Sequence, residues 1–103
     1  MVDILITNWK PLRRGALRGF VTATLPSGMV IYEISVLVSN GKAWVSPPSK
    51  SMIDRDGRVM FDDAGKRRYS AIIEFTSKEI RDRFSTAVVA ALRAAYPGAL
   101  ADE

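Results

Sequence analysis

The repeat of apolar residues changes along this chain, from every second position to a helical spacing. Residues 17–25 and 30–38 alternate apolar and polar side chains, as strands with one buried face do. From residue 80 to Tyr96 the apolar residues recur at helical spacing, and Pro97 and Gly98 follow. A sheet and a helix that each have one apolar side bury it by packing together. We therefore predict an α+β domain: an antiparallel β-meander sheet with one long C-terminal amphipathic helix packed on one face.

The alternation also predicts how the strands pair. With a four-residue loop after Leu25, the apolar faces of the first two alternating strands coincide, whereas a slip of one residue would set Val21 against Glu33. A turn at Ser39-Asn40-Gly41 then adds a third strand to the same oily face. The expected pairs are Val21 with Ile34, Ala23 with Tyr32, Leu25 with Val30, Val36 with Val45 and Val38 with Ala43.

Two consecutive prolines, Pro47 and Pro48, interrupt the third strand of this meander. Proline lacks a backbone N–H and fixes its own φ, so the strand cannot pair past Val45 or Ser46. We therefore expect Ser49 and Lys50 to be exposed to solvent and not buried. The other expected elements are a strand at 4–9, a basic connection at 10–15, a turn at 54–57 between short strands near 52–53 and 59–61, a strand at 71–75, and a capping box at 76–79 with Thr76 as its cap.

Length and charge bound the function. The chain of 103 residues is expected to form one domain, residues 1–96, with a short C-terminal tail at 97–103. Its formal charge of +4 is uneven, with four bases and no acid from Lys10 to Arg18 and a triplet at Lys66-Arg67-Arg68. Basic patches favour phosphate backbones or acidic partners. No apolar run approaches the roughly 18 residues of a membrane span, and no basic leader precedes one, so we expect a cytoplasmic protein without a membrane contact.

Enzymatic activity is not expected. The chain has no cysteine and no histidine, which removes thiolate nucleophiles, imidazole bases and the zinc sites built from them, and no cofactor is predicted. Asp54-Arg55-Asp56-Gly57 resembles a calcium loop, but its glycine comes too early and Gly65 occupies the position of the bidentate glutamate. A plain turn is the better interpretation. Ser49 and Lys50 have no oxyanion hole or third orienting group.

The sheet face opposite the helix has two interpretations. It can be a stacking platform on which bases lie against Phe20 or Trp44 while Arg18 meets phosphate. It can also be covered by protein, either a second subunit or residues 51–70. Tryptophan and phenylalanine side chains on a sheet surface are more often covered by protein than by nucleic acid. The residues expected on this face are Arg18, Phe20, Thr22, Glu33, Ser35, Leu37 and Trp44.

Several segments resemble the SpoVG family, the stage V sporulation protein G or septation regulators of bacteria. These are residues 17–21, the strand at 29–38, Asn40-Gly41-Lys42, Trp44-Val45 and Pro48-Ser49-Lys50. The similarity covers about residues 2–95, and the Asn-Gly turn, the strand and the Pro-Ser-Lys succession are its most specific part.

The resemblance implies a small mixed sheet with a C-terminal helix, a homodimer formed through strand pairing, and binding of DNA and RNA in gene regulation. Of the basic segment that begins at Pro-Ser-Lys in the family, only Lys50 is matched here, because Ser51 and Met52 stand where further basic residues are common. The usual His-Pro pair before the helix is absent as well. The triplet at 66–68 is a candidate substitute for the missing cations.

We therefore expect a nucleic-acid-binding regulator, for DNA or RNA, that acts as a cytoplasmic homodimer in bacterial transcription, septation or sporulation. The alternative is a protein–protein interaction module that docks through the face of Trp44 and Phe20, with incidental basic loops. A third option is an enzyme accessory subunit that recognises an acidic partner. The expected nucleic-acid-binding residues are Lys50, Arg55, Arg58, Lys66, Arg67 and Arg68, with Arg18, Phe20 and Trp44 on the sheet and Arg83 on the helix. Arg81 and Arg93, also on the outside of the helix, would extend the basic surface.

Overall fold

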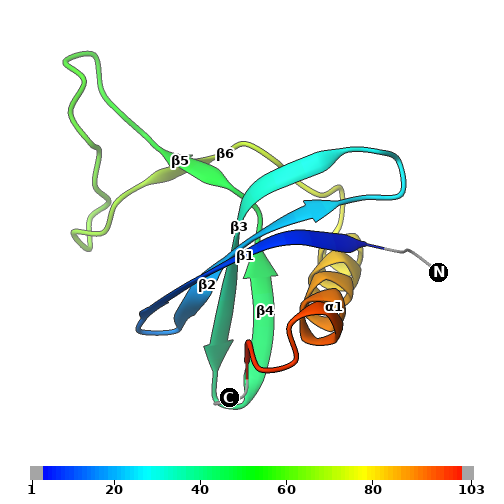
Figure 1. Ribbon diagram of the computed structural model, residues 1–103. Coiled ribbons are helices and arrows are strands. Elements are labelled where there is room, and N and C mark those ends of the chain that lie inside the picture. The colour runs from blue at the N-terminus through cyan, green and yellow to red at the C-terminus, as the bar shows by residue number, and fades with distance from the viewer. Residues whose placement is uncertain (1–3, 101–103) are drawn as a thin grey trace.

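The computed structural model describes residues 4–100, which form a four-stranded antiparallel sheet, one helix and a projecting two-stranded ribbon. Figure 1 shows helix α1 against one side of the sheet and the ribbon extending away from it. The predicted α+β meander with a C-terminal helix is confirmed. The sheet has the order β1-β2-β3-β4, from β1 (Leu5–Arg14), β2 (Leu17–Thr24), β3 (Val30–Ser39) and β4 (Lys42–Ser46); β5 (Ser49–Ser51) pairs with β6 (Tyr69–Ala71), and α1 (Lys78–Ala95) follows.

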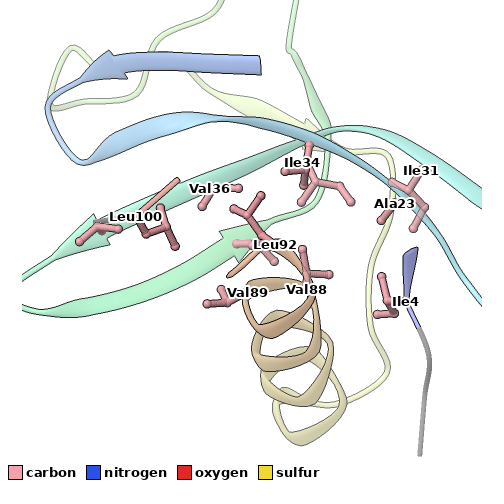
Figure 2. Packing of buried hydrophobic residues seen from close by; sticks show 12 residues of the cluster. Ile4, Ala23, Ile31, Ile34, Val36, Val88, Val89, Leu92 and Leu100 are labelled. Carbon is pink, nitrogen blue, oxygen red and sulfur yellow. The ribbon is translucent and has the colours of Figure 1, made fainter. Parts of the chain in front are cut away.

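The core lies between α1 and the inner face of the sheet. Val88 and Leu92 of α1 are fully buried against Ile34 and Val36 of β3, and Figure 2 shows these side chains pointing toward one another. Burying each such side chain contributes roughly 1.5–3 kcal/mol. This contact therefore fixes the helix on the sheet.

The register agrees with the prediction over the central part of the meander. Val21 lies opposite Ile34, and Val36 lies opposite Val45. Val38 also pairs with Ala43 as expected. The inner face is apolar wherever these pairs follow the simple alternation of the sequence.

Beyond Val21 the predicted register is wrong. Ala23 lies opposite Ile31 instead of Tyr32, because β3 contains one extra residue at a β-bulge where Glu33 has φ 58°. The bulge reverses the alternation, so Ile31 is buried while Tyr32 is 66% exposed. Val30 now pairs with Thr24 and not with Leu25, and it is exposed; a second bulge at Arg18 sets Leu37 opposite Leu17.

The end of β4 is confirmed. A two-residue turn at Asn40 and Gly41, both with positive φ, connects β3 to β4. The strand ends at Ser46, immediately before the two prolines. Its outer edge faces α1, and the Val45 N–H donates to the Ser85 hydroxyl at 2.9 Å. The helix thus occupies the edge that β4 would otherwise leave open.

The predicted capping box is wrong by one residue. Ser77 is the N-cap of α1, and its hydroxyl accepts from the Ile80 N–H at 3.2 Å. Glu79 is then the second helical residue and cannot complete a capping box, which needs a glutamate at the third position. Ile80 is 46% exposed, so the buried stripe begins at Phe84. The predicted end of the helix before Pro97 is confirmed.

Strand β1 is longer than predicted. Residues 10–14, expected as part of a connection, continue the strand through Pro11 to Arg14, and only Gly15 and Ala16 link β1 to β2. Pro11 is tolerated because β1 lies at the edge of the sheet, where a missing backbone donor faces no further strand.

The packed core reaches past the helix. Leu100, which falls in the expected tail, is 3% exposed and belongs to the core cluster. The remaining tail residues, 101–103, and the start of the chain, 1–3, lie outside the described residues. Within residues 4–100, the single helix does not combine the length and the apolar character that crossing a membrane requires.

The backbone of β1 and the Trp9 ring lie close to Gly19 of β2. A Cβ at this position, where φ is 157°, would lie 2.4 Å from the Lys10 carbonyl oxygen and 2.7 Å from the Trp9 ring. We expect Gly19→Ala to lower the free energy of unfolding by about 1–3 kcal/mol, because neither backbone nor ring can move aside cheaply. Urea denaturation followed by circular dichroism measures the change. Gly98→Ala is the control, since nothing lies within 4 Å of its Cβ position; equal stability of the two variants would contradict the close approach.

Candidate nucleic-acid interface

Residues 49–71, which we call the arm, leave the body of the protein between β4 and α1 (Figure 1). At its base β5 pairs with β6, with Lys50 opposite Ser70. From Ile53 to Arg58 and from Phe61 to Tyr69 every residue is exposed. The arm therefore presents its side chains to solvent.

Three backbone hydrogen bonds close a triangle at the centre of the arm. The Met52 N–H donates to the Arg68 carbonyl, the Arg68 N–H to the Met60 carbonyl, and the Met60 N–H to the Met52 carbonyl, at 2.9, 3.0 and 2.9 Å. Three short ribbons leave this triangle: the β5–β6 base, a hairpin at 53–59 and a hairpin at 61–67. The arm is thus a three-way junction of antiparallel pairs.

The two hairpins have the same turn. In the first, Asp54 Oδ1 accepts from the N–H groups of Asp56 and Arg58 at 2.9 and 3.0 Å. In the second, Asp62 Oδ1 accepts from the corresponding N–H groups of Ala64 and Lys66, both at 2.9 Å. Each turn is completed by a glycine with positive φ, at 57 and 65. The turn predicted at 54–57 is confirmed, and the Asp54 carboxylate binds backbone N–H groups there.

The strand predicted at 71–75 is wrong. Strand β6 covers Tyr69–Ala71, where Ala71 lies opposite Ser49. The next residue, Ile72, would lie opposite Pro48, which has no N–H to donate, so pairing stops there. The short pairings expected near 52–53 and 59–61 are present as a single bridge between Ile53 and Val59.

Four of the predicted cations share one face of the arm. Residues that are directly opposed, or two apart along an extended segment, point to the same side. Lys50 lies opposite Ser70, and Arg68 and Lys66 lie two and four residues before Ser70, so the three cations share a face. Met60 is bonded to Arg68 across the junction, and Arg58 lies two residues before Met60, so Arg58 points to the same face. We call this side, with Lys50, Arg58, Lys66 and Arg68, the basic face. Among residues 4–100, no ion pair joins these four side chains to a carboxylate.

The other two cations of the arm lie elsewhere on it. Arg67 is opposite Phe61 and therefore points to the other face, and Arg55 lies in the first hairpin turn. Six basic and four acidic side chains give the arm a net charge of +2. Two of the four carboxylates, Asp54 and Asp62, lie opposite Arg58 and Lys66 and accept from turn N–H groups. The other two, Asp56 and Asp63, are exposed to solvent as the cations are.

The predicted residues on the sheet do not join the arm. The Arg18 guanidinium donates to the Gly15 carbonyl at 2.7 Å and to the Leu17 carbonyl at 3.3 Å, so it holds the β1–β2 connection. Phe20 is half-buried, and Trp44 is 36% exposed beside Leu37. These side chains form a separate, partly covered patch on the outer face of the sheet.

Three cations of α1, Lys78, Arg81 and Arg83, belong to local pairs. Arg83 donates to Glu79 at 2.7 Å, and Lys78 donates to Asp82 at 2.7 Å. The hydrogen bond from Lys78 lowers the pKa of Asp82 below its usual value. Arg81 lies 3.9 Å from the same carboxylate, and Arg93 is exposed in the last turn. Such pairs offset the positive charge along this side of α1.

Two features were not predicted from the sequence. The arm repeats an Asp-x-x-Gly-(Lys/Arg) pattern eight residues apart, at 54–58 and 62–66. Such a repeat in the sequence indicates two similar hairpins. A mainly apolar groove of about 1190 Å³ lies between β1 and α1, and Leu5, Ala87, Ala91 and Ala94 are among the residues that line it. The groove depends on how β1 and α1 pack, which no local pattern encodes.

The order of the second hairpin depends on one carboxylate. We expect Asp62→Ala to increase the hydrogen-exchange rates of the Ala64 and Lys66 amides, because both donate to Asp62 Oδ1. The matching amides of Asp56 and Arg58 in the first hairpin serve as the internal control. Amide exchange measured by NMR reports both sets. Unchanged exchange at Ala64 and Lys66 would contradict the assigned turn.

Comparisons with known proteins give no identification. No family model, no curated protein and no solved structure matches this chain. A functional proposal therefore depends on the residues of the chain and on their arrangement in the fold.

Proposed function

We propose that this protein is a nucleic-acid-binding regulator that acts as a homodimer and holds phosphate backbones with the arm. The observation that carries the proposal is the basic face, where Lys50, Arg58, Lys66 and Arg68 project from a segment that extends away from the body. Phosphate contacts of this kind bind DNA or RNA without reading a sequence.

The position of the arm suits a polyanion. Charges on an exposed ribbon act within a Debye length of about 8 Å at physiological salt, so a ligand must come close to the arm to be held. The arm extends from the body and leaves room for a polymer to do so. A small anion would need a closed pocket of convergent donors, whereas exposed cations spread along a ribbon match repeated phosphates.

The sequence resemblance to the SpoVG family supports the same function. The last segment of its most specific part, Pro48-Ser49-Lys50, leads into the arm, and Lys50 is the one matched cation. The pairing of Lys50 with Ser70 brings the triplet at 66–68 back beside it. This geometry supports the triplet as a substitute for the cations that the family carries directly after its lysine.

The homodimer in this proposal uses the outer edge of β1. Among residues 4–100 no strand pairs with the outer edge of β1; α1 contacts β1 as well as β4, and the apolar groove lies between β1 and α1. Pro11 and the bases that follow it oppose edge pairing in the second half of β1, which leaves residues 5–9 available. Leu5, which is 63% exposed and lines the apolar groove, lies within residues 5–9.

Removing the basic triplet tests the phosphate contacts. We expect the variant with Lys66→Ala, Arg67→Ala and Arg68→Ala to bind DNA and RNA of any sequence more weakly. The slope of log K against log salt should fall by about one unit for each phosphate group that the variant no longer binds. Fluorescence anisotropy with short labelled oligomers at several salt concentrations measures both quantities.

A charge-matched control separates the arm from net charge. Lys78→Ala, Arg81→Ala and Arg83→Ala together remove the same charge from α1 and should leave the slope near that of the wild type. Equal affinity of the triplet variant and the wild type would exclude the triplet from the site. Binding that hardly responds to salt in the wild type would instead favour a protein-docking function for the face of Trp44 and Phe20.

A second substitution tests the dimer. We expect Leu5→Asp to yield a monomer by sedimentation velocity, because it places a charge in the proposed contact without disturbing the core. Leu12→Asp is the control: Leu12 is also exposed on β1 but follows Pro11. A wild-type monomer, or a Leu5→Asp dimer, would contradict the proposed contact.

A further inference from the structure

We propose that the face of the arm opposite the basic face stacks the bases of a single-stranded nucleic acid, mainly on Phe61 and Tyr69. The inference rests on the proposed nucleic-acid binding and names the form of the ligand. Phe20 and Trp44, for which a stacking platform is one of the two interpretations of the sequence, are not part of it.

The pairing of the arm places six side chains in a closed ring on this face. Around the junction, each of these residues is directly opposite one neighbour and two positions along the chain from another. Both relations place the side chains on the same side of the ribbon. The six pair as Ile53 with Val59, Phe61 with Arg67, and Tyr69 with Ser51. We call this side the aromatic face.

The aromatic face is open to solvent. Ile53, Phe61 and Tyr69 are 62%, 56% and 58% exposed and Arg67 is exposed as well, whereas Ser51 and Val59 of this face are half-buried. Strands β5 and β6 pack on each other, and no extensive contact joins them to α1 or to the four-stranded sheet among the described residues. Large apolar side chains gathered in this way mark a binding surface.

The aromatic face has the size that stacking of a few bases requires. A large apolar side chain can bury on the order of 200 Å², so three that are more than half exposed offer about 350 Å². Stacking of two or three bases on neighbouring aromatic rings of a β-surface needs no more than such a patch provides.

A cation accompanies the rings. Arg67 lies directly opposite Phe61 and points to the aromatic face. A guanidinium at this place can meet a phosphate between two stacked bases or lie flat against a base. An aromatic ring with an adjacent arginine is the usual combination in sites for single strands.

The two faces of the arm together select a flexible strand. The arm is a single layer of β-ribbon, with phosphate-binding side chains on one face and stacking side chains on the other. A duplex is stiff over about 150 base pairs and presents its bases only at groove edges, so it can contact one face at a time. A single strand can pass around the edge of the ribbon and contact both.

The test removes the rings but keeps the apolar character. In Phe61→Leu/Tyr69→Leu we expect the affinity for oligothymidylate to fall about tenfold or more, because each stacked base contributes roughly a five- to hundredfold factor. The salt slope should stay as in the wild type, since every phosphate-binding cation is kept. The affinity for a duplex of equal length should be unchanged.

Two further variants and one spectroscopic signal sharpen the test. Phe61→Tyr/Tyr69→Phe keeps both rings and should bind like the wild type. Tyr32→Leu removes an aromatic ring that is 66% exposed on β3, outside the arm, and should also bind like the wild type. Phe61→Trp should add a fluorescence component that oligothymidylate quenches and duplex does not.

Four outcomes would overturn the stacking inference. Equal affinity of the leucine variant and the wild type for oligothymidylate, or an equal loss for the duplex, overturns it while leaving phosphate binding intact. A leucine variant that changes from dimer to monomer in sedimentation velocity overturns it in favour of a contact with a second copy. Wild-type protein that binds neither oligomer at low salt overturns the proposed function and the inference together.

Discussion

The pair Pro47-Pro48 determines where the sheet stops and the arm begins. Neither residue has a backbone N–H, so β4 cannot lengthen beyond Ser46 and the chain must leave the sheet. The same absence limits β6, because Ile72 would have Pro48 as its partner. One local constraint thus places 23 residues, 49–71, outside the sandwich of sheet and helix. The helix then returns the chain to the body and covers the edge that β4 leaves open.

The arm achieves its order by backbone hydrogen bonding instead of a core. The triangle of Met52, Met60 and Arg68 satisfies three donors at the point where the ribbons meet, and the two aspartate turns fix the hairpin ends. Isolated two-stranded ribbons are marginal in water. Joining three of them at one junction, with two methionines half-buried at its centre, allows a thin segment to keep its two faces distinct.

The sequence predicted the features that depend on local pattern. The period change indicated the sheet and the helix, and the prolines marked the end of β4. The errors arise where a single backbone irregularity changes the result. Glu33 adopts a positive φ that no residue type enforces, and the bulge there exchanges Ile31 for Tyr32 on the buried face. Ser77, and not Thr76, is the cap, because either side chain can cap a helix and the local pattern does not distinguish them.

The candidate site was predictable in part. The cations of the arm were identified from charge alone, but their division between two faces follows from the register of the hairpins, which the repeated Asp-x-x-Gly pattern implies only once the junction is seen. The sequence places these cations in one candidate site with Arg18, Phe20, Trp44 and Arg83, but the structure does not bring the two sets together. Those four side chains lie on the sheet and the helix, where Arg18 and Arg83 already bind local partners.

The arm, and not the sheet face, is the proposed contact with nucleic acid. An amide NMR titration of the wild-type protein with oligothymidylate distinguishes the two surfaces residue by residue. We expect the largest changes in chemical shift within residues 49–71, including the neighbours of Lys50, Phe61 and Tyr69. Changes centred on Phe20 and Trp44, or no changes at low salt, would contradict binding by the arm.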